Sequence, residues 1–171
     1  MGDTILRPLA SIAEIQAAVD LQRDVWQAED RDLVPATEIV AARSNGGVVL
    51  GAWSGSRLVG FTFSMIGRRS GRVYQYSRML AVHPEWRGHG LGAALKLAQK
   101  EASLAAGDRW MEWTFDPLEG RNANLNVARL GVRVRHYERD FYGARTSRFD
   151  LGIPTDRVRA EWDLEEDLDV T

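Results

Sequence analysis

Three glycines at alternate positions, Gly88, Gly90 and Gly92, have the spacing that points most directly to chemistry in this chain. They lie between an apolar run that ends at Val82 and an apolar segment that begins at Leu91. Glycine has no Cβ, so the backbone N–H groups of such a loop can converge on one anion where a helix begins. The loop therefore predicts a binding site for a phosphate or diphosphate.

Two other nucleotide-binding loops fit this segment less well. Residues 88–93 match the dinucleotide fingerprint G-x-G-x-x-G/A, which would indicate a nicotinamide cofactor. In that fold the first glycine follows its strand directly and an acidic residue ends the second strand. Here residues 84–87 intervene and Asp108 precedes the second strand, so we expect no nicotinamide. A Walker A loop is excluded because no Gly-Lys-Ser/Thr follows the glycines.

The elements that position the loop are predicted from hydrophobic patterns and turn residues. Ser11 and Glu14 form a capping box that opens a helix, and Pro35 opens a second helix at 36–43. The predicted strands are 4–7, 48–53, 58–66, 73–82, 109–115, 132–142 and one within 148–164, and the further predicted helices are 91–106 and 123–130. The strand, helix, strand order of residues 73–115 implies a parallel pair of strands. We expect one mixed α/β domain, residues 1–171.

Segments on both sides of the glycines resemble the GNAT superfamily of acyl-CoA-dependent N-acyltransferases. Residues 87–92 fit its signature Arg/Gln-x-x-Gly-x-Gly/Ala, residues 80–84 fit the strand that precedes it, and residues 116–131 look like its next motif. The resemblance covers most of the chain. It implies the GNAT fold, a mixed sheet of six to seven strands flanked by about four helices, in which the parallel strands four and five splay apart.

The resemblance also implies a binding site for acetyl-CoA or another acyl-CoA. The expected diphosphate-binding residues are those of the loop: Arg87, Gly88, His89, Gly90, Leu91 and Gly92. The Leu80 N–H would point at the thioester carbonyl, where negative charge develops, and the Val82 N–H would pair with pantetheine. Asn126 would contact an amide of CoA, and Arg129 would reach a phosphate.

The reaction also needs a general base for the amine and an acid for the departing thiolate, and the sequence offers several candidates for each. Val127 occupies the position where the family often has a tyrosine that donates a proton, and valine cannot do so. Another tyrosine, Tyr142 or Tyr137, a water, or no acid at all takes its place. The strand before the loop contains no carboxylate, and Glu112 becomes the first candidate for the general base. A structural carboxylate at that position is an equal alternative. Asp116 and a bound water are further candidates for the base.

Composition excludes several other classes of protein. A net charge of −2, from 22 basic and 24 acidic residues, predicts no nucleic-acid or membrane partner. The chain has no cysteine and its three histidines lack metal-ligand spacing, so we expect no metal. The sequence shows no signal-peptide pattern and no apolar run long enough to span a bilayer, so we expect a cytoplasmic protein. A homodimer is the oligomeric state that we consider.

Together these observations predict an N-acyltransferase. By resemblance, the reaction is direct attack of an amine on the thioester of acetyl-CoA or succinyl-CoA. We expect a small-molecule acceptor such as an amino acid, because residues 152–162 look like a subgroup that includes relatives of amino-acid N-succinyltransferases. A protein N-acetyltransferase is the first alternative. A CoA-binding regulatory domain without catalysis is the second, because Val127 and the missing carboxylate depart from the family pattern.

Overall fold

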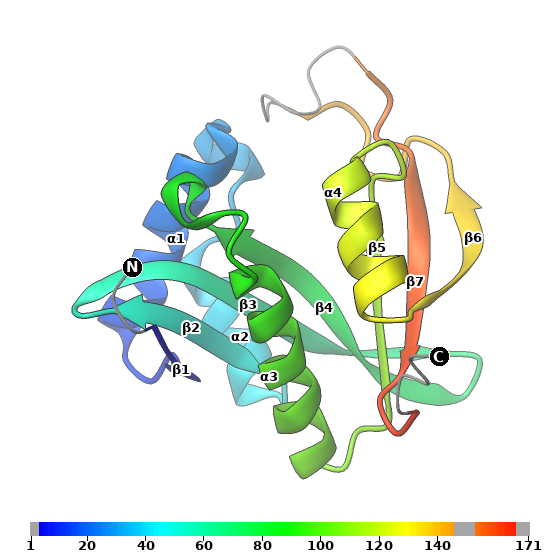
Figure 1. Cartoon of the computed structure of the whole chain (residues 1–171), viewed down its shortest axis with the longest axis horizontal. Helices are drawn as coiled ribbons and strands as arrows, with labels where there is room; N and C mark the ends of the chain where they lie inside the picture. The colour runs from blue at the N-terminus through cyan, green and yellow to red at the C-terminus, as the bar shows by residue number, and fades with distance from the viewer. Residues whose placement is uncertain (1–3, 146–152, 167–171) are drawn as a thin grey trace.

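A computed structural model describes residues 4–145 and 153–166 of the chain. Within them, one mixed sheet has the strand order β1-β2-β3-β4-β5-β7-β6 (Figure 1). Its strands are β1 Ile5–Pro8, β2 Val49–Ser54, β3 Arg57–Arg69, β4 Arg72–Val82, β5 Trp110–Phe115, β6 Arg133–Glu138 and β7 Arg157–Asp163. The helices are α1 Ile12–Trp26, α2 Ala36–Ser44, α3 Leu91–Ala105 and α4 Gly120–Ala123, which continues as a π-helix, Asn124–Arg129. Short 3₁₀ helices lie at Asp30–Asp32 and Pro84–Trp86.

The predicted capping box starts α1 and connects it to β1. The Glu14 N–H donates to Ser11 Oγ (3.2 Å), and the Ser11 N–H donates back to the Glu14 carboxylate (3.1 Å). Arg7 of β1 forms an ion pair with the same carboxylate at 2.6 Å. The predictions of this helix and its starting residue are confirmed.

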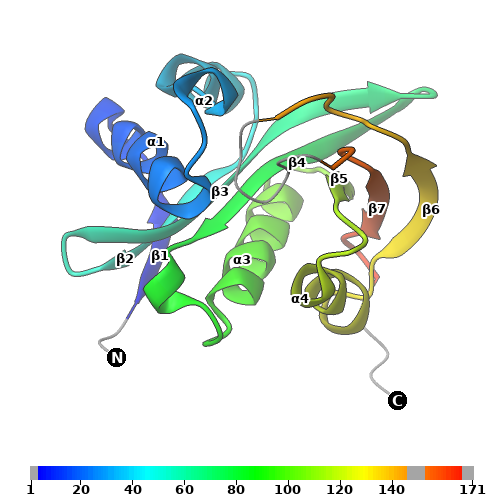
Figure 2. The ribbon, with the colours of Figure 1, turned by 90° about the horizontal axis from the view of Figure 1, so that it is seen from above.

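The helices cover both faces of the sheet. Figure 2 shows α1 and α2 on one face, and α3 and α4 on the other. The core on the first face joins the side chains of α1 and α2 to β2 and β3, for example Ile15 and Ile39 to Phe61 and Phe63. A second core joins β5 and β7 to the π-helix and includes Trp162. The sheet therefore has two separately packed halves, which meet where β4 lies beside β5.

Strands β4 and β5 are parallel but stay paired over a short length only. The register joins Gln75 to Met111 and Tyr76 to Glu112. On its other side β4 pairs with β3 in antiparallel register through Val82. The two strands therefore separate toward their C-terminal ends, as Figure 1 shows. The predicted GNAT fold, with six to seven strands and a splayed parallel pair, is confirmed, and the sheet has seven strands among the described residues.

The predictions for the last third of the chain were wrong in detail. The strand expected at 132–142 ends at Glu138, because Asp140 adopts a left-handed turn conformation (φ 43°) and its N–H donates to the Asp156 carboxylate. The expected α-helix at 123–130 is largely a π-helix, in which the Leu130 N–H donates to the Leu125 carbonyl. By contrast, the strand expected within 148–164 is confirmed as β7, and residues 148–152 lie outside the described residues.

Candidate active site

The backbone of β4 directs two N–H groups into the space where β5 diverges. The His83 N–H donates to the Val59 carbonyl of β3 at 2.9 Å. In an antiparallel ladder, hydrogen-bonded and non-hydrogen-bonded residue pairs alternate along the strand. Val82 and Leu80 lie one and three positions before His83, so they occupy the non-hydrogen-bonded pairs. Their N–H groups consequently point away from β3, as the resemblance implies for a thioester site.

A β-bulge sits just before these residues. The register passes from Met79 opposite Phe63 to Ser77 opposite Ser64, which leaves Arg78 as the extra residue of β4. The Thr62 hydroxyl donates to the Met79 carbonyl (2.9 Å) next to the bulge. A bulge bends its strand and re-aims a side chain. Here it turns β4 away from β5 and places the Arg78 side chain in the pocket described below.

The loop after β4 presents the N-terminus of α3 to an anion. Gly88 and Gly90 adopt left-handed backbone conformations (φ 82° and 80°), which glycine accepts without strain. Gly90 is the N-cap residue of α3, the helix has no side-chain cap hydrogen bond, and no acidic residue lies in its first turn. The positive end of the helix dipole and its N–H groups are therefore available to a negatively charged ligand.

A groove of about 1210 Å³ runs from this loop along the gap between β4 and β5. Seven of the ten predicted CoA-binding residues line it: Leu80, Val82, Arg87, Gly88, Gly90, Leu91 and Gly92. Arg87 is fixed at the edge of the groove because its Nε donates to the Val82 carbonyl at 3.1 Å. Among the described residues that line the groove we do not find His89 or Arg129, both of which are exposed.

A smaller pocket of about 230 Å³ adjoins the groove. Leu80 and Thr114 line both cavities, so the two meet beside the residue whose N–H the resemblance assigns to the thioester. Trp26, at the end of α1, also lines both. Asn126 lies in the small pocket, is 2% exposed, and donates from Nδ2 to the Asn122 side chain at 3.2 Å. The arrangement can hold a long donor in the groove and a small acceptor in the pocket.

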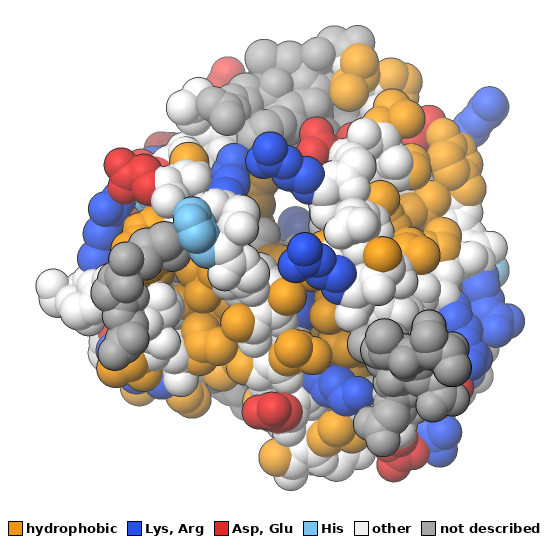
Figure 3. Space-filling view, in the orientation of Figure 1, with side chains coloured by type: hydrophobic (Ala, Val, Ile, Leu, Met, Phe, Trp, Pro, Cys, Tyr) orange, Lys and Arg blue, Asp and Glu red, His pale blue; other side chains and the backbone are white. Residues whose placement is uncertain are grey.

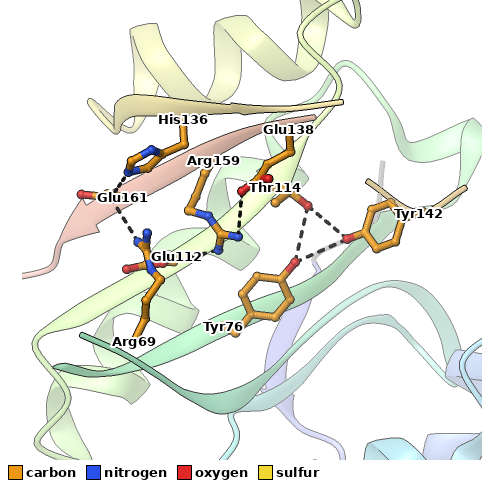
Figure 4. Close-up of polar contacts among 9 residues, drawn as sticks. All are labelled: Arg69, Tyr76, Glu112, Thr114, His136, Glu138, Tyr142, Arg159 and Glu161. Atoms are coloured by element: carbon orange, nitrogen blue, oxygen red, sulfur yellow. Dashed lines mark hydrogen bonds and ion pairs between the residues drawn. The ribbon is translucent and has the colours of Figure 1, made fainter. Parts of the chain in front are cut away.

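Tyr142, the predicted acid, points into the space between β4 and β5. Its hydroxyl lies 3.0 Å from Thr114 Oγ1 and 3.4 Å from the Tyr76 hydroxyl (Figure 4). Burial, together with the neighbouring Tyr142, raises the pKa of Tyr76 to about 12. Tyr76 therefore stays protonated, and Tyr142 is the tyrosine of this pair that lines the pocket.

Glu112, the first candidate for the base, lies among arginines. Its carboxylate is 1% exposed and forms ion pairs with Arg69 (2.8 Å) and Arg159 (3.6 Å), and Arg69 also reaches Glu161 (Figure 4). The hydrogen bond to Glu112 raises the pKa of the Arg69 guanidinium. Among the described residues that line the two cavities we do not find Glu112. This geometry favours the alternative of a structural carboxylate.

The other candidates for acid and base are spread around the groove. Asp116 lines its wall, and its carboxylate accepts a hydrogen bond from the Leu118 N–H at 2.8 Å. Tyr137 is exposed and donates to the Asp156 carboxylate, which raises the pKa of Tyr137. Val127 is 51% exposed on the π-helix. Of these three residues, only Asp116 lines the groove or the small pocket.

Sequence reasoning missed a buried lysine and three arginines that line the small pocket. Lys96 of α3 is 2% exposed, donates from Nζ to Ser77 Oγ (2.9 Å) and Gln99 Oε1 (3.1 Å), and burial lowers its pKa well below the usual value. Its position on the apolar face of a predicted helix was the available signal. The arginines are Arg78, Arg145 and Arg157. They come from three separate segments, so no local pattern could have united them.

A mixed sheet with a splayed parallel pair and an anion-binding helix start defines the class of acyl-CoA N-acyltransferase folds. Residues 12–126 match the acetyltransferase (GNAT) family, and the chain therefore belongs to this family of N-acyltransferases. No curated protein matches the chain.

Solved structures of acetyltransferases share the fold. One is yncA from Salmonella typhimurium with its cofactor acetyl-CoA, with a TM-score of 0.74 and 18% identity over 96% of both chains. Another is the ribosomal-protein-S18-alanine N-acetyltransferase from Escherichia coli, with a TM-score of 0.76 and 11% identity over 99% of both chains. The paia N-acetyltransferase from Thermoplasma acidophilum in complex with coenzyme A has a TM-score of 0.67 and 16% identity, over 94% of this chain and 99% of that one.

The described residues, 4–145 and 153–166, contain neither a candidate membrane-spanning helix nor a candidate metal-binding cluster. In that part of the chain no helix has the length and apolar character needed to cross a bilayer. It also contains no group of three or more His, Asp or Glu side chains placed to hold a metal ion.

Proposed function

We propose that this chain transfers an acyl group from acetyl-CoA or a related acyl-CoA to the amine of a small molecule. The observation that carries the proposal is the meeting of the groove and the small pocket at Leu80. The pocket is smaller than the roughly 300–1,000 Å³ of sites for drug-sized ligands, which favours a small acceptor over a polypeptide. The family supplies the reaction class, and the size of the pocket supports the kind of acceptor.

The proposed reaction is direct attack within the ternary complex. The lone pair of a neutral amine attacks the thioester carbon, and the Leu80 N–H donates to the oxygen on which negative charge develops. The C–S bond then breaks, the amide forms, and the amine nitrogen loses its proton to water or another base. Tyr142 is the proposed acid that protonates the departing thiolate of CoA.

The loop and groove residues have proposed roles in holding CoA. The N–H groups from Arg87 to Gly92 bind the diphosphate at the start of α3, and the Val82 N–H pairs with pantetheine. Asn126 contributes an amide contact beside the thioester. The side chains of His89 and Arg129 are exposed. His89 takes part in the proposal through its backbone N–H, and Arg129 through a contact with a phosphate of CoA.

The experiment is a measurement of CoA thiol release across a panel of amines, together with calorimetric binding of acetyl-CoA. We expect binding of acetyl-CoA and amine-dependent release of thiol that survives dialysis against a chelator. Binding without release for any amine would refute catalysis and leave the regulatory alternative. Release with peptides but not with small amines would refute the acceptor class. A homodimer, a cytoplasmic location and the likeness to N-succinyltransferases stay predictions.

A further inference from the structure

Three guanidinium groups surround one tyrosine ring in the small pocket. The Cζ atoms of Arg78, Arg145 and Arg157 lie 5.6, 5.5 and 5.5 Å from the ring centroid of Tyr142. Arg78 is the bulge residue of β4, Arg157 begins β7, and Arg145 follows β6. The fold therefore gathers three positive charges from distant segments at one place.

The pocket holds a surplus of positive charge. Among the described residues that line it, three are arginines and one is acidic, Asp32. Lys96 also lines it, but burial lowers its pKa, so its charge is left out of this balance. Arg145 donates to the backbone carbonyl of Asp32 (3.2 Å), so this contact does not neutralise its charge. Figure 3 shows Lys and Arg side chains gathered around the hollow between the two halves of the molecule. Like charges this close repel one another, and an anion bound among them would relieve that cost.

The side chain of Arg145 carries a buried hydrogen-bond donor that no described residue accepts from. Among the described residues, Nε of Arg145 is buried without a hydrogen-bond partner. An unsatisfied buried donor is costly, and a bound oxyanion would satisfy it. A guanidinium group offers a planar pair of donors that matches a carboxylate in a bidentate arrangement. The pocket thus combines positive charge, an unsatisfied N–H donor and guanidinium groups whose geometry suits a carboxylate.

We propose that this pocket binds an acceptor amine that also carries a carboxylate, and that Arg78, Arg145 and Arg157 hold the carboxylate beside Tyr142. The proposal rests on the proposed function and names the class of its acceptor. Arg78 is two residues from Leu80 along β4, and both line the pocket. A carboxylate held by the arginines therefore leaves the amine of a molecule the size of an amino acid close to the thioester position.

The experiment compares acceptors that differ only at the carboxylate. A panel of α-amino acids is assayed beside the corresponding α-amides, and kcat/KM is measured for the wild type and for Arg78→Gln and Arg145→Gln. We expect the preference for acid over amide to fall about tenfold or more in each variant, because each variant loses charged hydrogen bonds to the carboxylate. Comparing the ratio between variants cancels the difference in intrinsic amine reactivity.

Arg72→Gln is the matched control. Arg72 lies on the same strand and its Cζ stacks over the Trp110 ring at 4.0 Å, but it lines a different pocket. We expect this variant to keep the acid preference, and we expect all three variants to bind acetyl-CoA as the wild type does. An unchanged acid-to-amide ratio in both Arg78→Gln and Arg145→Gln would overturn the proposal, as would preferred turnover of phosphoethanolamine over every amino acid.

A binding measurement separates this proposal from the proposed function. If acetyl-CoA binds but no amine is acylated, the proposed function fails, and N-acetylglycine and N-acetylglycinamide are titrated into the CoA-loaded protein. Tighter binding of the acid, at least tenfold in the wild type and lost in Arg78→Gln, would support the carboxylate site. Equal affinity for the two probes would refute it.

Discussion

Gly90 and Gly71 allow a sharp test of the anion-binding loop. Both have nearly the same left-handed backbone (φ 80° and 79°), and a Cβ built on either meets no protein atom within 4 Å. A valine at either position should therefore cost about the same, roughly 1–2 kcal/mol for a left-handed L-residue. For a chain of this length each kcal/mol lowers Tm by about 2–4 °C. Only Gly90, the N-cap of α3, borders the groove.

The expected difference between the two variants is in ligand binding. Gly90→Val places a branched side chain where the diphosphate approaches the loop, so the Kd for acetyl-CoA should rise at least about tenfold, or about 1.4 kcal/mol. Gly71→Val should lose a similar amount of stability and keep its affinity. Calorimetry gives the Kd and thermal unfolding gives the stability cost. Wild-type affinity in Gly90→Val, or an equal loss of affinity in both variants, would refute the reasoning.

Three further substitutions test the chemistry around the junction. Glu112→Gln should lower the free energy of unfolding by about 1–3 kcal/mol, because it weakens buried ion pairs. Its kcat should stay within a few-fold of the wild type. A decrease in kcat of about a hundredfold would instead identify Glu112 as the base. Tyr142→Phe should lower kcat by about a hundredfold, because it removes the proposed acid. Tyr137→Phe is the control, since the Tyr137 hydroxyl donates to the Asp156 carboxylate outside the pocket. Equal kcat values in the two variants would contradict the role of Tyr142. Lys96→Met should raise Tm near neutral pH. Burial lowers the pKa of Lys96, so the unfolded chain, with a lysine pKa near ~10.4, binds more protons and wild-type stability rises with pH in this window. The advantage of Lys96→Met in Tm should therefore shrink from pH 7 to pH 10. A constant difference across that range would show that folding does not lower the pKa of Lys96.

The donor side of the site could be predicted from the sequence because it is built from backbone. Its N–H groups belong to β4 and to the start of α3, which follow one another in residues 80–92. Apolar alternation predicts the strand, and glycine spacing predicts a loop that an anion can approach closely. The boundaries of α2 and α3, and the start of α1, were predicted to within about a residue for the same reason, since caps and turn residues are local signals.

The acceptor side could not be predicted, because its side chains meet only in the folded chain. A one-residue bulge does not change composition, yet it shifts the alternation of β4 and turns Arg78 into the pocket. The left-handed turn at Asp140 ends β6 early and brings Tyr142 back over Thr114. Because β7 lies between β5 and β6 in the sheet, Arg157 at the start of β7 lies beside the Tyr142 ring. If the proposed acceptor pocket is correct, specificity for the acceptor depends on a bulge, a turn and a strand order, and each can change while the glycine loop stays the same.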